Sequence, residues 1–300
     1  MKHAIRTDLA VEAEQLWRES GEKTSALSGI RAGEREQNGF AIRTVEVLDA
    51  RGEEAIGKPK GTYVTLELDG FLRREENSFS EAAALLAGEL RSILPMENGG
   101  SVLVVGLGNR GITPDAIGPE TVDNILVTRH LKEKLPEEFA AFRPVSAVCS
   151  GVLGTTGIES SDLVRAVSEE IHPSAVFAVD ALASRSTARL CRTVQIADTG
   201  IVPGSGVGNA RQALNRETLG VPVVAIGVPT VVDAATLTLD LASRSGTELD
   251  PDSFGAVGSM IVTPRDIDKN VRDVAKLIGY ALNLAFHEGL SMEDIDMLLS

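Results

Sequence analysis

Two aspartates stand at the ends of apolar runs, and their chemistry is the most specific that the sequence offers. Asp115 follows the run 101–105 and a glycine loop, and Asp180 closes the run 175–180. An aspartate at the end of a buried strand is costly to desolvate unless it is paired, hydrogen-bonded or protonated. Two neighbouring carboxylates cannot easily both ionise, so the pair holds a general base beside a general acid. Such a pair can activate water against a peptide carbonyl and protonate the leaving nitrogen.

Other interpretations of these carboxylates stay open at this point. Asp115 can equally be a capping or turn carboxylate, and a pair of carboxylates can hold a divalent metal. Serine-hydrolase and zinc-hydrolase chemistry have no support, because no histidine lies in a nucleophile elbow or a His-x-x-x-His pair. The four histidines are His3, His130, His172 and His287.

The glycine loop before Asp115 spells G-x-G-x-x-G through Gly106, Gly108 and Gly111, which is the dinucleotide-binding pattern. A dinucleotide site needs a helix that starts inside this loop, and Pro114 falls where that helix should already run. A proline inside a helix costs about 3 kcal/mol. The acidic residue expected about 20 positions further on is also missing, because that count falls inside a predicted helix. We therefore expect no cofactor, and a nucleotide-binding oxidoreductase is the disfavoured alternative.

The elements that must position the two aspartates alternate along the chain. Short, continuous apolar runs are typical of buried parallel strands, and helical stretches separate them. The predicted strands are 101–105, 145–149, 175–180, 193–198, 221–228 and 260–263, and the helical stretches between them are 120–134, 159–171 and 230–243. This pattern predicts an α/β fold with a mostly parallel, mixed sheet flanked by helices. Ligands of such sheets bind at the carboxyl ends of the strands, so Asp115 and Asp180 are expected to face each other.

The first hundred residues have a different pattern, and we expect them to form an N-terminal extension of mixed structure on one single domain. No internal repeat and no linker divides the chain. The predicted elements outside the alternating region are a helix 8–19 capped by Thr7 or Asp8, a strand 61–68, a helix 78–94 opened by Ser80, a long helix from Pro264 to about Glu288, and a short helix capped by Ser291.

Composition excludes several classes of function. The net charge is −14 and the pI is about 4.8, so the chain repels phosphate backbones and no nucleic-acid partner is expected. The N-terminus lacks the apolar core of a signal peptide, and no apolar run approaches the ~18 residues that span a membrane. We therefore expect a cytoplasmic protein without a membrane partner, in which Cys149 and Cys191 are buried thiols.

A second glycine-rich loop, 195–209, supplies further candidates for substrate binding. Asp198 follows an apolar run, and backbone N–H groups around Gly204 and Gly206 can line an anion or a substrate strand. A structural cluster of turns fits the same residues. Together with Asn109 in the first loop, these three residues are the candidate substrate-binding set.

Several longer segments lie in order and span most of the chain: IRTDLAVEA (5–13), VVGLGNRGITPDAIGP (104–119), LVTRHL (126–131), FRPVSAV (142–148), GVLGTTGIESSD (151–162), VDALASRS (179–186), QIADTGIVPGSGVGNAR (195–211) and GVPTVVDA (227–234). These segments resemble the germination proteases of spore-forming bacteria. The two aspartates assigned as catalytic in that family match Asp115 in TPDAIGP and Asp180 in VDALASRS.

The resemblance implies an aspartic-type endopeptidase with a phosphorylase/hydrolase-like α/β fold, similar to that of hydrogenase maturation proteases. It further implies degradation of small acid-soluble spore proteins at germination, in the cytoplasm of the forespore and spore core. Members of the family are made as zymogens that process themselves, and they assemble as homotetramers. The resemblance implies neither a metal nor another cofactor.

The resemblance also implies a site of self-cleavage. The family cuts after an acidic residue that is followed by a hydrophobic residue and then alanine, and Asp8, Leu9 and Ala10 reproduce this order. Cleavage between Asp8 and Leu9 would release a pro-segment, 1–8, and leave 9–300 as a single α/β peptidase domain.

Two features depart from the family. Ile5 stands four positions before the bond, where an acidic residue is expected, and tethering can compensate for its absence through effective concentration. Only a short loop, about 244–258, replaces a longer family segment, which leaves that segment's role in regulation or assembly open. A metal-dependent, maturation-type peptidase and a non-catalytic binding protein that retains the fold remain the alternative functions.

Overall fold

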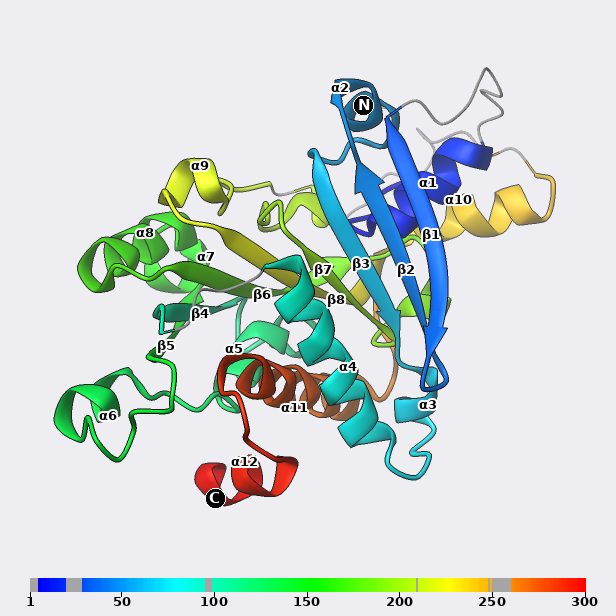
Figure 1. The fold of residues 1–300 in the computed structure, drawn as a ribbon. Coiled ribbons are helices and arrows are strands. Elements are labelled where there is room, and N and C mark those ends of the chain that lie inside the picture. The colour runs from blue at the N-terminus through cyan, green and yellow to red at the C-terminus, as the bar shows by residue number, and fades with distance from the viewer. Residues whose placement is uncertain (1–4, 20–28, 95–98, 209, 248, 250–259) are drawn as a thin grey trace.

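The computed structural model describes residues 5–19, 29–94, 99–208, 210–247, 249 and 260–300. Its centre is one nine-stranded sheet with the strand order β1-β2-β3-β7-β8-β6-β4-β5, and β9 (Ile261–Val262) pairs with an extension of β8. Helices flank this sheet, as Figure 1 shows. The α/β class and the mixed sheet expected from the sequence are confirmed.

Parallel pairing is confined to four strands in the middle and at one edge of the sheet. In spatial order they are β5 (Val145–Gly151), β4 (Val102–Leu107), β6 (Ala175–Ala183) and β8 (Val223–Asp233). Every residue of β4 and β8 is buried, which explains why both strands are continuous apolar runs in the sequence. The carboxyl ends of β4 and β6 therefore lie side by side.

The other half of the sheet is antiparallel, formed by β1 (Ile30–Gln37), β2 (Phe40–Val47), β3 (Gly61–Glu67) and β7 (Thr193–Ala197). The β1–β2 hairpin was missed by the sequence analysis because seven of the eight residues of β1 are exposed and show no apolar alternation. A local signal was present in the turn. Asn38 and Gly39 both have positive φ, as a two-residue Asn-Gly hairpin turn requires.

Two helical layers cover the two faces of the parallel strands. Val102 and Val104 of β4 belong to the core beneath α4 (Ser78–Ile93), α5 (Ile117–Val122) and α11 (Ile267–Phe286). The alternate residues Leu103 and Val105 pack on the opposite face, with Val164 of α8 (Ser160–Ile171). Figure 1 shows α4 and α11 side by side across the sheet. Both faces of β4 are thus buried, and polar groups can reach solvent at its end.

Several predicted boundaries were wrong. The predicted helix 120–134 is two separate helices, α5 and α6 (Arg129–Lys134). The helix predicted from residue 230 begins at Ala234, because 230–233 stay in β8. The predicted long helix begins at Ile267 instead of Pro264. The predicted loop 244–258 falls largely outside the described residues.

The remaining elements are short or peripheral: α1 (Ala10–Glu19), α2 (Ala50–Ile56), α3 (Asp69–Leu72), η1 (Thr113–Asp115), α7 (Leu153–Thr156), η2 (Thr187–Arg189), η3 (Ser205–Val207), α9 (Arg216–Leu219), α10 (Ala234–Arg244) and α12 (Met292–Leu299). Cys191 is buried as expected, but Cys149 is exposed, because it lies on the edge strand β5.

Candidate active site

The glycine loop after β4 places Asp115. Gly108 has φ +105°, and a Cβ atom on it would lie 2.1 Å from the backbone oxygen of Asp115, so only glycine fits this close approach. The loop turns into the short 3₁₀ helix η1, which ends at Asp115, and the backbone N–H of Asn109 donates to Asp115 Oδ2 at 2.8 Å. No long helix starts inside the loop, since α5 begins only at Ile117. Gly108 thus allows the loop to place the Asp115 carboxylate.

Asp180 lies on β6, next to β4, and its side chain is only 5% exposed. The strand does not end at this residue, as the sequence suggested, but continues to Ala183. The backbone N–H of Ala181 donates to Asp180 Oδ1 at 2.9 Å. Asp180 is therefore a buried carboxyl group within a strand, with one local hydrogen-bond donor.

Asp115 and Asp180 line the same cavity, whose volume is about 480 Å³. Three of the four candidate substrate-binding residues line it as well, namely Asn109, Gly204 and Gly206. Asp198 does not, because its side chain is exposed and accepts a hydrogen bond from the backbone N–H of Thr62 at 2.8 Å. Other lining residues are Asp8, Leu107, Pro114, Leu153, Ala183, Ser205, Arg211 and Thr230.

The two carboxyl groups have unequal surroundings. Burial raises the pKa of Asp180 well above its ordinary value of 3.8, and the negative charge of Asp115 raises it further, against the opposing hydrogen bond from Ala181. The charge of Asp8 is a smaller cause in the same direction. Burial also raises the pKa of Asp115, but the N–H of Asn109 stabilises its charged form. Asp180 is thus the group that keeps a proton, and Asp115 is the one that ionises first.

The N-terminal segment reaches into this cavity through Asp8. Its carboxylate accepts hydrogen bonds from the backbone N–H of Ala183 (2.8 Å) and from Ser205 Oγ (2.7 Å), and its own backbone N–H donates to the Ala183 oxygen at 2.9 Å. Asp8 therefore does not cap the first helix, although the sequence allowed that interpretation. The next residue, Leu9, is fully buried against Val11 and Leu182.

Gln195 holds the chain on both sides of the Asp8–Leu9 peptide bond. Its Nε2 donates to the Asp8 backbone oxygen at 3.4 Å, and its Oε1 accepts from the Ala10 N–H at 2.7 Å. Lys58 donates to the Thr7 backbone oxygen at 3.2 Å. The sequence analysis named neither residue. A glutamine within the buried strand β7 was the available signal for Gln195, since a polar side chain there needs partners.

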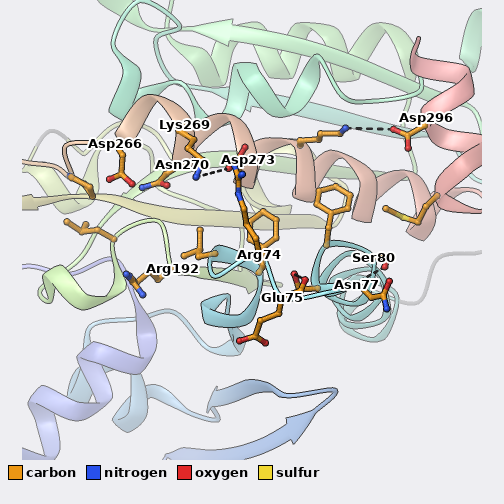
Figure 2. Close-up of a pocket in the computed structure, with 18 of the residues that line it drawn as sticks. Arg74, Glu75, Asn77, Ser80, Arg192, Asp266, Lys269, Asn270, Asp273 and Asp296 are labelled. Atoms are coloured by element: carbon orange, nitrogen blue, oxygen red, sulfur yellow. Dashed lines mark hydrogen bonds and ion pairs between the residues drawn. The ribbon is translucent and has the colours of Figure 1, made fainter.

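A larger cavity, of about 740 Å³, is lined by neither Asp115 nor Asp180 and is shown in Figure 2. Residues of α4, α11 and α12 contribute to its lining, and none of the predicted site residues is among them. Its lysines are paired with acidic side chains, Lys269 with Asp273 at 3.9 Å and Lys276 with Asp296 at 3.8 Å. Its size alone does not give this cavity a chemical function, and the smaller cavity, which Asp115 and Asp180 line, is the candidate active site.

Among the residues that the structure describes, no cluster of three or more His, Cys, Asp or Glu side chains is arranged to hold a metal ion. Within the same residues, no helix has the length and apolar character to cross a membrane.

Comparison with known proteins identifies the family. The family model described as germination protease matches residues 8–243, a span that begins at Asp8 and includes Asp115 and Asp180. The chain belongs to the germination protease family. It is thus a protease of spore germination, as the sequence resemblance implied.

Germination proteases from two named organisms match over nearly the whole chain. The protein from Caldanaerobacter subterraneus subsp. tengcongensis is 41% identical, over 98% of this chain and 98% of its own length. The protein from Clostridium tetani is 40% identical, over 99% and 100%. Among solved structures, the [NiFe] hydrogenase maturation protease HycI from Thermococcus kodakarensis has 18% identity and a TM-score of 0.34, over 62% of this chain and 94% of its own.

Proposed function

We propose that this germination protease degrades small acid-soluble spore proteins, cuts after an acidic residue that precedes a hydrophobic residue and alanine, and activates itself by cutting between Asp8 and Leu9. The observation that carries the proposal is the placement of the chain's own Asp-Leu-Ala sequence. The Asp8 side chain lines the cavity that Asp115 and Asp180 line.

The unequal pKa values assign different roles to the two aspartates. Asp115, in its ionised form, takes a proton from a water molecule, whose oxygen then attacks the carbonyl carbon of the acidic residue before the bond. Asp180, in its protonated form, donates a hydrogen bond to the carbonyl oxygen and then transfers its one proton to the leaving nitrogen, and the proton that Asp115 took from water passes to Asp180 and restores the starting state. The carbon–nitrogen bond breaks, and the products are a new carboxylate and a new amine. Gln195, which donates to the Asp8 carbonyl, orients the bond for attack.

The same contacts explain a preference for an acidic residue before the bond. The N–H of Ala183 and the hydroxyl of Ser205 are donors aimed at the Asp8 carboxylate, and a side chain that leaves the N–H of the buried Ala183 unpaired is disfavoured. Backbone at Gly204 and Gly206 lines the same cavity, so these glycines and Asn109 are proposed to contact the substrate. We give Asp198 no such role.

Incubation of the purified chain tests this function. We expect its intact mass to fall by the mass of residues 1–8, and a small acid-soluble spore protein to be cut after acidic residues. A chain that stays intact and leaves the spore protein uncut would support the non-catalytic alternative. Complete inhibition by a chelator, reversed by a divalent ion, would support the metal-dependent one.

Replacement of Gly206 by alanine should slow self-cleavage by about 10²-fold, because displacement of a reacting group by about 1 Å has a cost of that size. The new Cβ would lie 2.0 Å from Asp8 Oδ2, so the acidic side chain must leave its donors. Gly154→Ala is the matched control, since Gly154 lines the same cavity and its Cβ would meet nothing within 4 Å. The rates are read by mass spectrometry. Equal self-cleavage rates for Gly206→Ala and Gly154→Ala would show that the bound position of the Asp8 side chain does not matter for cleavage.

We also propose that the protein works as a homotetramer in the cytoplasm of the forespore and spore core, with residues 9–300 as the mature domain. The family resemblance supports this proposal. Light scattering on the purified chain tests the assembly, with a molar mass near four times 31.7 kDa as the expected result.

A further inference from the structure

A buried carboxylate lies next to the amine side of the Asp8–Leu9 bond. Glu12 is 1% exposed and is the third residue of α1. The N–H of Leu9 donates to Thr7 Oγ1 at 3.0 Å, and the Thr7 hydroxyl in turn donates to Glu12 Oε2 at 2.6 Å. A hydroxyl of the pro-segment therefore bridges the nitrogen of the proposed cleavage bond and a carboxylate of the mature chain.

Glu12 is also joined to the loop that continues β6, the strand of Asp180. Its carboxylate accepts from Ser184 Oγ at 2.9 Å, from the Arg185 N–H at 2.7 Å and from the Ser186 N–H at 3.2 Å. Since β6 ends at Ala183, this one side chain ties the start of α1 to the end of the strand that carries Asp180. A shift in the position of the Glu12 carboxylate can thus be transmitted to Asp180 through these hydrogen bonds and the end of β6.

Helix geometry puts the third residue of a helix within reach of the residue before its first. In a capping box, a glutamate at this third position accepts a hydrogen bond from the backbone nitrogen of the residue that precedes the helix. In α1 these two residues are Glu12 and Leu9, and Thr7 now stands between them. Removal of Thr7 would let the carboxylate and the nitrogen meet directly.

Cleavage would create a charge at this point. Hydrolysis adds the hydroxyl of one water molecule to the Asp8 carbonyl carbon and a proton to the Leu9 nitrogen, and the amine takes up one more proton from solvent to become an ammonium group. Leu9 is fully buried, and a positive charge at a helix N-terminus opposes the helix dipole. A buried, unpaired ammonium group is costly, so the mature chain needs an anion at this position.

We propose that Glu12 is the partner of the new Leu9 ammonium group and that this ion pair locks the mature form. The inference rests on the proposed self-cleavage. When residues 1–8 leave, the Thr7 hydroxyl leaves Glu12 Oε2 and the ammonium group takes its place. Glu12 is a positioning residue, since it acts on catalysis through the loop after β6. Release of the pro-segment thereby affects Asp180 through Glu12 and the loop that follows β6.

The test compares two chains that are both cut but differ in the position of the new N-terminal ammonium group. In two full-length chains, a recognition sequence for a site-specific protease replaces residues 1–8, and the folded chains are then cut. One cut leaves Leu9 as the first residue, and the other leaves one additional glycine before it, which displaces the ammonium group. We expect the Leu9-first form to melt about 3 °C higher, a shift typical of one modest interaction in a chain of this size. We also expect its kcat on a spore-protein peptide to be about tenfold higher at similar KM.

Charge variants decide whether Glu12 is the partner. Glu12→Gln should abolish the difference in Tm and in kcat between the Leu9-first and glycine-extended forms, whereas Glu14→Gln should keep it, because Glu14 pairs with Arg18 on the same helix. An equal difference in Glu12→Gln, or no difference in the unsubstituted chain, would overturn the proposal. The comparison in the unsubstituted chain does not depend on whether the Glu12→Gln variant folds. Because the site-specific protease makes the cut, the difference in Tm can be measured even if the chain never cuts itself. A failure of the proposed self-cleavage is therefore distinguished from a failure of the proposed ion pair.

Discussion

Replacement of Asp180 by asparagine is expected to lower the rate of peptide-bond cleavage by about 10²–10⁴-fold, the usual contribution of a general acid or base. Asparagine has the same shape as the protonated carboxyl group, so the fold should persist, and it can keep the hydrogen bond from the Ala181 N–H. It cannot donate a proton to a leaving nitrogen. The spore-protein cleavage rate and the loss of residues 1–8 should fall together, because one pair of carboxyl groups serves both reactions.

Two further variants make this result interpretable. Asp115→Asn should have an effect of similar size, because the base and the acid act in the same turnover. Asp198→Asn is the matched control, since Asp198 does not line the cavity and its exposed side chain accepts a hydrogen bond from the Thr62 N–H. Circular dichroism checks that each variant is folded. Full activity in either Asp115→Asn or Asp180→Asn would reject the assigned roles.

The stability of the folded chain should fall as the pH rises through the raised pKa of Asp180. Between the ordinary value of 3.8 and the higher folded pKa, the folded state binds the proton of Asp180 and the unfolded state has released it. Fewer protons on the unfolded chain mean that a rise in pH favours unfolding. Each unit of pKa difference corresponds to about 1.4 kcal/mol. At neutral pH, Asp180→Asn should therefore be more stable than the unsubstituted chain.

Urea unfolding of both proteins from pH 4 to pH 8 measures this effect. Other groups titrate in the same range, such as His287, whose pKa burial lowers to about 4, but they are common to both chains and cancel in the difference. The difference in unfolding free energy should grow with pH until Asp180 is fully ionised in the folded state. A constant difference across this range would mean that Asp180 has an ordinary pKa.

The central strands and both aspartates were predictable because they depend on strong local signals. Continuous apolar runs mark the buried strands β4, β6 and β8, and a glycine loop between a strand and a Pro-Asp turn marks Asp115. Parallel strands then bring their carboxyl ends together, so two distant aspartates reach one cavity. The sequence analysis ended this strand at the polar residue Asp180, although the apolar residues Ala181, Leu182 and Ala183 continue β6 beyond it.

The contacts of the N-terminal segment were not predictable, because they join parts of the chain that are far apart. Asp8 reads locally as a helix cap, and only the fold reveals that Ala183 and Ser205 hold its side chain. Asp198 reads locally like Asp180, an aspartate after an apolar run, yet the antiparallel strand β7 ends away from the cavity. Strand direction, which no local pattern encodes, separates the two.

The most direct measurement of the central claim is a carboxyl ¹³C NMR titration of Asp180 in the unsubstituted chain and in Asp115→Asn. The account predicts that Asp180 titrates well above its ordinary value of 3.8 in the unsubstituted chain, and that its pKa falls in the variant because the neighbouring charge is gone. An Asp180 that titrates at its ordinary value, or whose titration is unchanged by the loss of Asp115, would contradict a protonated Asp180 beside an ionised Asp115.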